Sequence, residues 1–164
     1  MGKSELFNNA LYRPVMYRAG GFPVKRDAPD RAAVEYAKKL LMNEEALVIY
    51  PEGELNKTKS PMMKMKQGPA KIALDAAWES GKPIAVVTAA ELYFPTARLG
   101  ANAYIGFNKP FYINDFVESY QAESKGTIAH VTSIIEEGIV RKIHEMEEKY
   151  HITVPEEKEF FWMV

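Results

Sequence analysis

Residues 46–53 read ALVIYPEG, and this stretch decides the fold class of the 164-residue chain. Its first five residues, Ala46–Tyr50, form a continuous apolar run that ends at Pro51. A run of this length after a helical segment is typical of a strand that is buried on both faces in a parallel sheet. A second apolar run, Pro83–Ala90, predicts another buried strand.

Helical patterns alternate with these two strands. Asp30 is a predicted N-cap, and Pro69 suits the first turn of a second helix that ends near Gly81. A long apolar stripe predicts a third helix over Thr127–Tyr150. We therefore expect one α/β domain over residues 1–164, with a central, mostly parallel or mixed sheet flanked by helices. Its C-terminal region, from about residue 117 to 164, is expected to be helical.

The composition excludes several classes of protein. The chain has no cysteine, which rules out a disulfide scaffold, a thiol nucleophile and cysteine-ligated metal, and which fits a reducing compartment such as the cytoplasm. The net charge of −1 argues against a nucleic-acid partner held by bulk charge. The apolar runs fall far short of the roughly 18 residues that indicate a membrane span.

The small net charge hides a basic first half. Residues 1–82 carry a balance of +4, and residues 83–164 carry −5. Positions 55–74 contain five lysines, interleaved with methionines, and no acid. Because lysines approach anionic headgroups while methionines enter acyl chains, this segment predicts a peripheral membrane contact; the alternative is a solvated basic loop with gap-filling methionines. The predicted contact residues are Lys57, Lys59, Met62, Met63, Lys64 and Met65.

Two charged residues follow predicted strands. Arg26 comes just after the short apolar segment Phe22–Val24, and Glu52 comes just after Ala46–Tyr50. Ligands of open α/β sheets collect at the carboxyl ends of strands, where an arginine can grip phosphate and a glutamate can accept hydrogen bonds from a polyol. We expect the two side chains to face a common cleft. The alternatives are a plain surface arginine and a glutamate that caps a turn.

Five segments follow one another along the chain: Gly20–Arg26, Tyr50–Gly53, Met65–Gly68, Lys82–Val87 and Ile105–Pro110. In this order they resemble the motifs of the glycerolipid acyltransferases, which include the 1-acylglycerol-3-phosphate acyltransferases. The family's blocks are Gly-x5-Arg, Phe-Pro-Glu-Gly-Thr-Arg, of which Tyr50–Gly53 matches the first half, Phe-Lys-x-Gly, Val-Pro-Ile-Val-Pro-Val and a Gly-Lys-Pro strand. The resemblance extends from about residue 4 to residue 116.

The resemblance implies a glycerol-3-phosphate acyltransferase-like fold and a reaction. An acyl group would pass from acyl-coenzyme A or acyl-carrier protein to the hydroxyl of a lysophospholipid such as 1-acylglycerol-3-phosphate, at a membrane surface. Arg26 would bind the phosphate, Glu52 and Gly53 would shape the glycerol-phosphate pocket, and Lys66 and Gly68 would line the same face. The resemblance implies no metal and no further cofactor.

One motif of the family is absent. The family places Asn-His-x4-Asp before its Gly-x5-Arg block, with the histidine as general base, whereas the first histidine of this chain is His130. His130 and His144 are predicted to lie on the surface or core edge of the long helix, and His151 stands at the wrong end of the chain. We therefore expect no catalytic residue here, an N-terminally incomplete domain and little activity of the chain alone. The alternative is a non-catalytic relative that binds anionic lipid or a protein partner.

Overall fold

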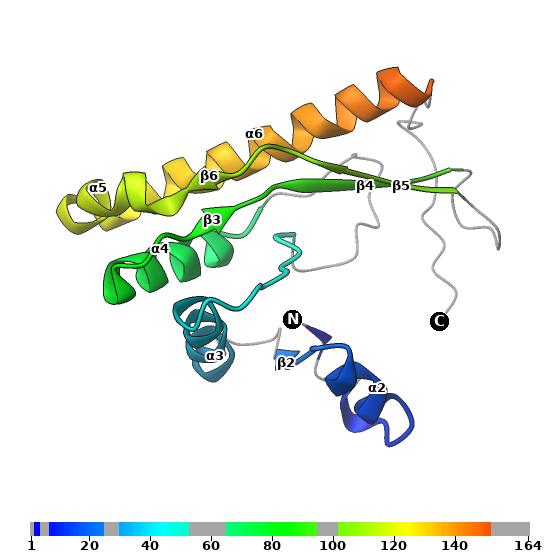
Figure 1. Ribbon diagram of the computed structural model, residues 1–164, viewed down its shortest axis with the longest axis horizontal. Helices are drawn as coiled ribbons and strands as arrows, with labels where there is room; N and C mark the ends of the chain where they lie inside the picture. The colour runs from blue at the N-terminus through cyan, green and yellow to red at the C-terminus, as the bar shows by residue number, and fades with distance from the viewer. Residues whose placement is uncertain (1, 4–6, 25–29, 53–64, 95–101, 152–164) are drawn as a thin grey trace.

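The computed structural model of the chain describes residues 2–3, 7–24, 30–52, 65–94 and 102–151 (Figure 1). Helices and strands are mixed along the chain, as expected for the α/β class. The helices are α2 (Tyr12–Arg18), α3 (Arg31–Met42), α4 (Gly68–Ser80), α5 (Val117–Ala122) and α6 (Ser124–Tyr150), with a 3-10 turn, η1, at Ile113–Phe116. The strands are β1 (Gly2–Lys3), β2 (Pro23–Val24), β3 (Ala85–Val86), β4 (Ala89–Phe94), β5 (Asn102–Phe107) and β6 (Phe111–Tyr112).

The three predicted helices are confirmed, and their end residues explain where they begin and end. Asp30 caps α3, because its Oδ1 accepts a hydrogen bond from the backbone N–H of Ala33 at 3.1 Å. Pro69 stands in the first turn of α4, where a missing N–H costs nothing. Gly81 ends α4 at a φ of 64°, a left-handed conformation that glycine adopts without strain. The third helix is α6.

The main core lies where α4, η1 and α6 meet. The buried side of α4 is rich in alanine, and these small side chains let neighbouring helices approach closely. Leu74 of α4, Ile113 of η1 and Val131 of α6 are the largest side chains that are fully buried. Burial of each contributes about 1.5–3 kcal/mol. Figure 1 shows α6 running along the strand pairs from α5 to the far end of β5.

The predicted central, mostly parallel or mixed sheet is not found among the described residues. The described strands form three separate pairs, of which β1–β2 is parallel and β3–β6 and β4–β5 are antiparallel. In the longest pair, β4–β5, alternate residues face α6, where Ala90 and Leu92 pack with Met146. The pair therefore has one face covered by a helix, which is the ordinary arrangement of an antiparallel sheet.

The stretch Ala46–Tyr50 is not a strand, contrary to the sequence prediction. Leu47 and Ile49 pack against the apolar cluster around α3, whereas Val48 and Tyr50 are 70% and 65% exposed. The run is continuous in sequence, but among the described residues it has a packed layer on one side only. The absence of polar residues had suggested burial on both faces. Burial on both faces needs a second packed layer, which the described residues do not provide.

The second predicted strand, Pro83–Ala90, is divided between β3 and the start of β4. Thr88, between them, is buried against α6. The side-chain amide of Asn108 donates to Thr88 Oγ1 at 2.8 Å and to the carbonyl oxygen of Gly138 at 2.7 Å. A Cβ on Gly138 would stand 2.8 Å from Thr88 Oγ1, so only glycine lets α6 approach this closely.

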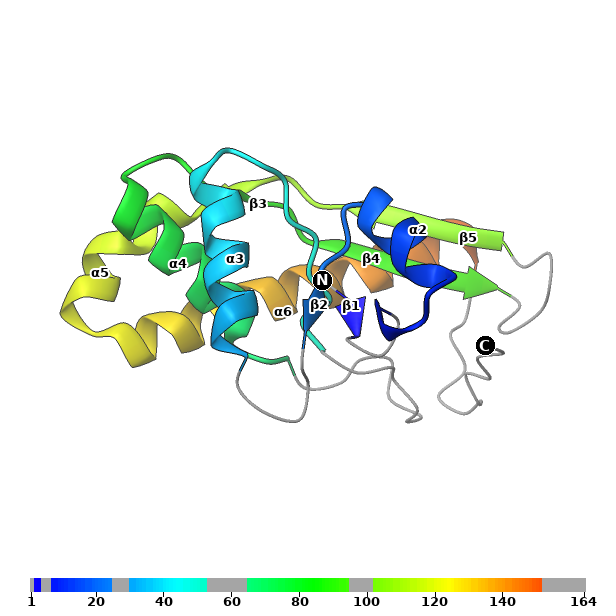
Figure 2. The same ribbon diagram turned by 90° about the horizontal axis from the view of Figure 1, so that it is seen from below.

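The two ends of the molecule differ in secondary structure. Figure 2 shows α3, α4 and α5 at one end and the β4–β5 pair at the other. Figure 1 places α2 on the side of the molecule opposite to α6. Lys38 links α3 to α4, because its ammonium pairs with Glu79 of α4 at 2.8 Å.

Candidate functional site

Two of the family-like segments are joined by a backbone hydrogen bond. The N–H of Lys66 donates to the carbonyl oxygen of Pro51 at 2.9 Å. This bond places the turn that holds Glu52 beside the start of α4, which follows at Gly68. The structure therefore brings together three of the predicted substrate-binding residues, Glu52, Lys66 and Gly68, although Glu52 is separated from Lys66 by fourteen positions.

The chemistry of this junction suits an anion that carries hydroxyl groups. Lys66 is exposed, and the first turn of α4 contains no acidic residue. The N-terminal end of a helix carries a partial positive charge, which adds to that of a nearby lysine. Glu52 is half-buried in the adjoining turn, where a carboxylate can accept hydrogen bonds from hydroxyl groups.

Crowding does not explain why residue 68 is a glycine. No atom of the described residues lies within 4 Å of the position that its Cβ would occupy. Its place at the entrance of α4 leaves the backbone open to an approaching ligand.

The phenol of Tyr50 ties the same segment to the β4–β5 pair. Tyr50 donates to Glu91 Oε1 at 3.2 Å, and Tyr93 donates to Glu91 Oε2 at 3.1 Å. Partial burial, together with the neighbouring Glu91 carboxylate, raises the pKa of both Tyr50 and Tyr93. Both phenols therefore remain protonated and able to donate around neutral pH. The sequence analysis missed this cluster; the alternation of Ala90 and Leu92 with Glu91 and Tyr93 is the signal that could have found it.

Met65 does not fit its predicted role as a membrane contact. Its side chain is only 6% exposed and packs in the main core beside α4. A methionine that follows a lysine-rich segment can fill a gap in the core as readily as it can face lipid, because its side chain is flexible and apolar. Met65 therefore anchors the start of α4.

The remaining predicted site residues lie outside the described residues. Arg26 and Gly53 are among them, so the cleft predicted for Arg26 and Glu52 and the pocket role predicted for Gly53 stay predictions. The proposed membrane contacts that share this status are Lys57, Lys59, Met62, Met63 and Lys64.

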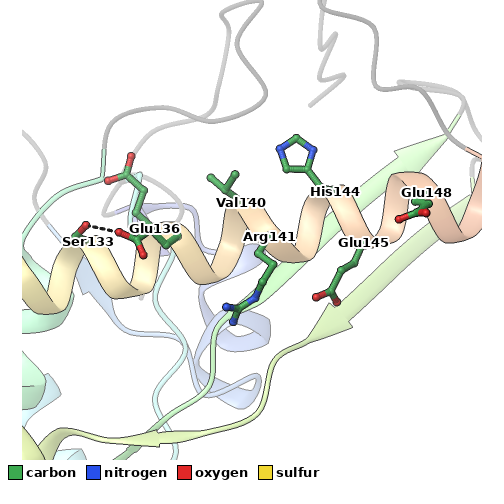
Figure 3. A pocket seen from close by; sticks show the side chains of 8 residues that line it. Ser133, Glu136, Val140, Arg141, His144, Glu145 and Glu148 are labelled. Atoms are coloured by element: carbon green, nitrogen blue, oxygen red, sulfur yellow. Dashed lines mark hydrogen bonds between the residues drawn. The ribbon is translucent and has the colours of Figure 1, made fainter.

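A shallow groove runs along the outer surface of α6 (Figure 3). The described residues that line it all come from this one helix, and Figure 3 shows Val140 and His144 pointing away from Arg141 and Glu145. The side chains do not converge, so the groove offers no enclosed site. The lining residues are Ser133, Glu136, Glu137, Val140, Arg141, His144, Glu145 and Glu148.

A family model described as acyltransferase matches residues 1–90. The chain belongs to the glycerolipid acyltransferase family. The match includes the first four family-like segments, and Ile105–Pro110 lies beyond it. Neither a search of curated proteins nor a search of solved structures returned a match.

The histidines of this acyltransferase-family chain lie far from the Pro51–Lys66 junction in sequence and stand on α6 or at its end. His130 is exposed and stacks edge-on against Phe116, with ring centroids 5.8 Å apart. His144 is exposed and its Nδ1 lies 3.1 Å from the Glu147 carboxylate. The prediction of helix-surface histidines is confirmed for both, and His151 occupies the left-handed C-cap of α6.

The part of the chain that the structure describes holds neither a metal-binding cluster nor a membrane-spanning helix. In that part, no three His, Cys, Asp or Glu side chains gather where they could hold a metal ion. None of its helices combines the length and the apolar character needed to cross a membrane.

Proposed function

We propose that this acyltransferase-family chain binds a lysophospholipid of the 1-acylglycerol-3-phosphate class as acyl acceptor. The donor would be an acyl thioester of coenzyme A or of acyl-carrier protein. The observation that carries the proposal is the hydrogen bond between Lys66 and Pro51, because it unites two separate family segments at the start of α4. In the proposed site, Lys66 and Arg26 hold the phosphate and Glu52 accepts hydrogen bonds from the glycerol hydroxyl groups.

The reaction of the family needs a general base that this chain lacks at the family's position. A C–O ester bond forms as the C–S bond of the thioester breaks, and the proton of the acceptor hydroxyl passes to a base and then to the thiolate. A positioned base contributes about 10²–10⁴-fold to the rate. The first histidine is His130, on the exposed surface of α6. The 164-residue chain alone should therefore bind the acceptor and turn it over slowly or not at all.

Calorimetric titration with a short-chain lysophosphatidate tests the binding step. Arg26→Ala should weaken binding by about 10–150-fold, because a hydrogen bond between charged groups contributes about 1.5–3 kcal/mol, and Arg26→Lys should restore it only in part. Lys66→Ala should weaken binding by about fivefold, since Lys66 is exposed to solvent. Lys125→Ala, which removes an exposed lysine of α6 outside the family-like segments, is the matched control. Equal affinities for Lys66→Ala and Lys125→Ala would contradict the proposed site.

A thiol-release assay separates the two roles that remain open. An acyltransferase should release coenzyme A from acyl-coenzyme A only when lysophosphatidate is present. A non-catalytic relative should bind lysophosphatidate and release no thiol above the rate without protein. Turnover by the chain alone at the pace of an ordinary enzyme would refute the expected lack of a base.

We also propose that the lysine-rich segment Lys57–Lys71 associates peripherally with a membrane surface. Five lysines without an acid in the sequence support this, at about 1 kcal/mol for each lysine near an anionic surface. The last of them, Lys71, lies in α4 and pairs with Asp75, so the contact would rest on the other four. The burial of Met65 limits the apolar part of the contact to Met62 and Met63. Pelleting with anionic vesicles should exceed pelleting with neutral ones and should fall as salt is added; equal pelleting would count against the contact.

A further inference from the structure

The helix α2 carries its apolar side chains outward. Leu11, at its N-cap, is 74% exposed, and Val15 is 62% exposed. No residue of α2, which is described throughout, is buried. Met16 is half-buried and lies on the inward side of the helix. Its carbonyl oxygen accepts a hydrogen bond from the N–H of Gly21 at 2.8 Å.

Helical geometry gathers the outward side chains on one face. Leu11, Pro14, Val15 and Arg18 stand at positions i, i+3, i+4 and i+7, so they line one side of the helix. In a helix packed on its domain this pattern marks the buried side, yet here all four residues are exposed. The apolar face of α2 is therefore turned away from the protein.

The charge of the described segment that holds this face is basic. Residues 7–24 contain two charged side chains, Arg13 and Arg18, both in α2, and no acid. An exposed apolar strip bordered by arginines matches a surface of anionic lipid headgroups over acyl chains. The outer face of β4–β5 is a useful contrast. It also exposes apolar side chains, including Phe107, but its charged residue is Glu91 and none of its described residues is a cation.

We propose that the outward face of α2 lies against an anionic membrane, with Leu11 and Val15 entering the headgroup region and Arg18 pairing with lipid phosphates. This contact extends the peripheral association proposed for Lys57–Lys71 to a second element. It does not depend on the acceptor site, so binding of a soluble headgroup and binding of vesicles can fail separately. The occupant is a lipid surface, and a second copy of the chain or a protein partner are outcomes that the test would expose.

The absence of cysteine allows a direct experiment. Val15→Cys labelled with an environment-sensitive nitrobenzoxadiazole dye should shift its emission to the blue with vesicles of phosphatidylcholine and phosphatidylglycerol in equal parts. It should shift little with phosphatidylcholine alone. Val87→Cys, at another half-exposed valine, is the matched control and should not respond.

Unlabelled variants give a second readout. Leu11→Ser should lower partitioning onto the anionic vesicles by about tenfold and Arg18→Gln by about fivefold, whereas Arg141→Gln, on the outer surface of α6, should leave it unchanged. An unresponsive dye at Val15, or an equal response at Val87, would overturn the proposal. A blue shift that grows with protein concentration in the absence of vesicles would also overturn it, and would assign the face to a second copy of the chain.

Discussion

Replacing Gly138 with alanine should destabilise the protein by about 1–3 kcal/mol, although alanine is the better helix former. The gain in helix propensity is about 1 kcal/mol. Against it stands a Cβ placed 2.8 Å from Thr88 Oγ1, and overpacking of this kind costs about 1–3 kcal/mol. The clash also disturbs the bonds from Asn108 to Thr88 and to the Gly138 carbonyl, each worth about 1 kcal/mol. The losses outweigh the gain.

Urea unfolding followed by circular dichroism measures this change. Gly68→Ala is the control, since among the described residues nothing crowds its Cβ, and it should not lower stability. Combining Gly138→Ala with Thr88→Ala should cost less than the sum of the two single changes, because removing the Thr88 hydroxyl makes room for the new methyl group. The reasoning is refuted if Gly138→Ala proves as stable as the parent protein.

Two further changes test the packing around α4. Tyr120→Phe should cost about 1–2 kcal/mol, because it removes the 2.6 Å hydrogen bond from the phenol to Asp75. Burial and this bond raise the pKa of Tyr120 above its ordinary value of 10.0, so the unfolded chain loses the proton first and stability should fall as the pH rises above about 10; chemical unfolding across that range should show a shallower fall in the variant. Asn114→Ala should cost about 2 kcal/mol by thermal unfolding, since its amide accepts from Ile84 N–H at 2.8 Å and donates to the Lys82 carbonyl at 2.9 Å. Asn114→Asp keeps the acceptor for Ile84 N–H but places a carboxylate oxygen against the Lys82 carbonyl oxygen, so it should also lower stability.

Local sequence signals predicted the helices well. The cap at Asp30, the proline at the first turn of α4 and the glycine at its end each act on residues a few positions away. The apolar stripe of α6 works in the same way, because its period is fixed by helix geometry. These signals needed no knowledge of distant parts of the chain.

The sheet could not be predicted, because strand pairing is a long-range property. Ala46–Tyr50 carries the composition of a buried strand, yet which layers cover it depends on residues far along the chain. Pro83–Ala90 is divided at Thr88, which hydrogen-bonds to Asn108 and packs against Gly138 of α6. No local pattern in the sequence encodes these contacts.

The sequence predicted which segments of the candidate site lie together, whereas their role in binding stays a prediction. The order of the family segments indicated that Glu52, Lys66 and Gly68 belong together, and the Lys66–Pro51 hydrogen bond joins their segments. The burial of Met65 and the convergence of Tyr50 and Tyr93 on Glu91 were missed, because both depend on which face of a segment meets the core.

The central claim is that a phosphate-bearing acceptor binds where α4 begins. Titration of the 15N-labelled chain with glycerol 3-phosphate, followed by amide chemical shifts, tests it most directly. The account predicts the largest and saturable shifts at the amides of Lys66, Gly68 and Ala70, with those of Glu136–Glu148 on α6 unmoved. Shifts concentrated on the α6 groove, or none at the start of α4 at saturating ligand, would contradict it.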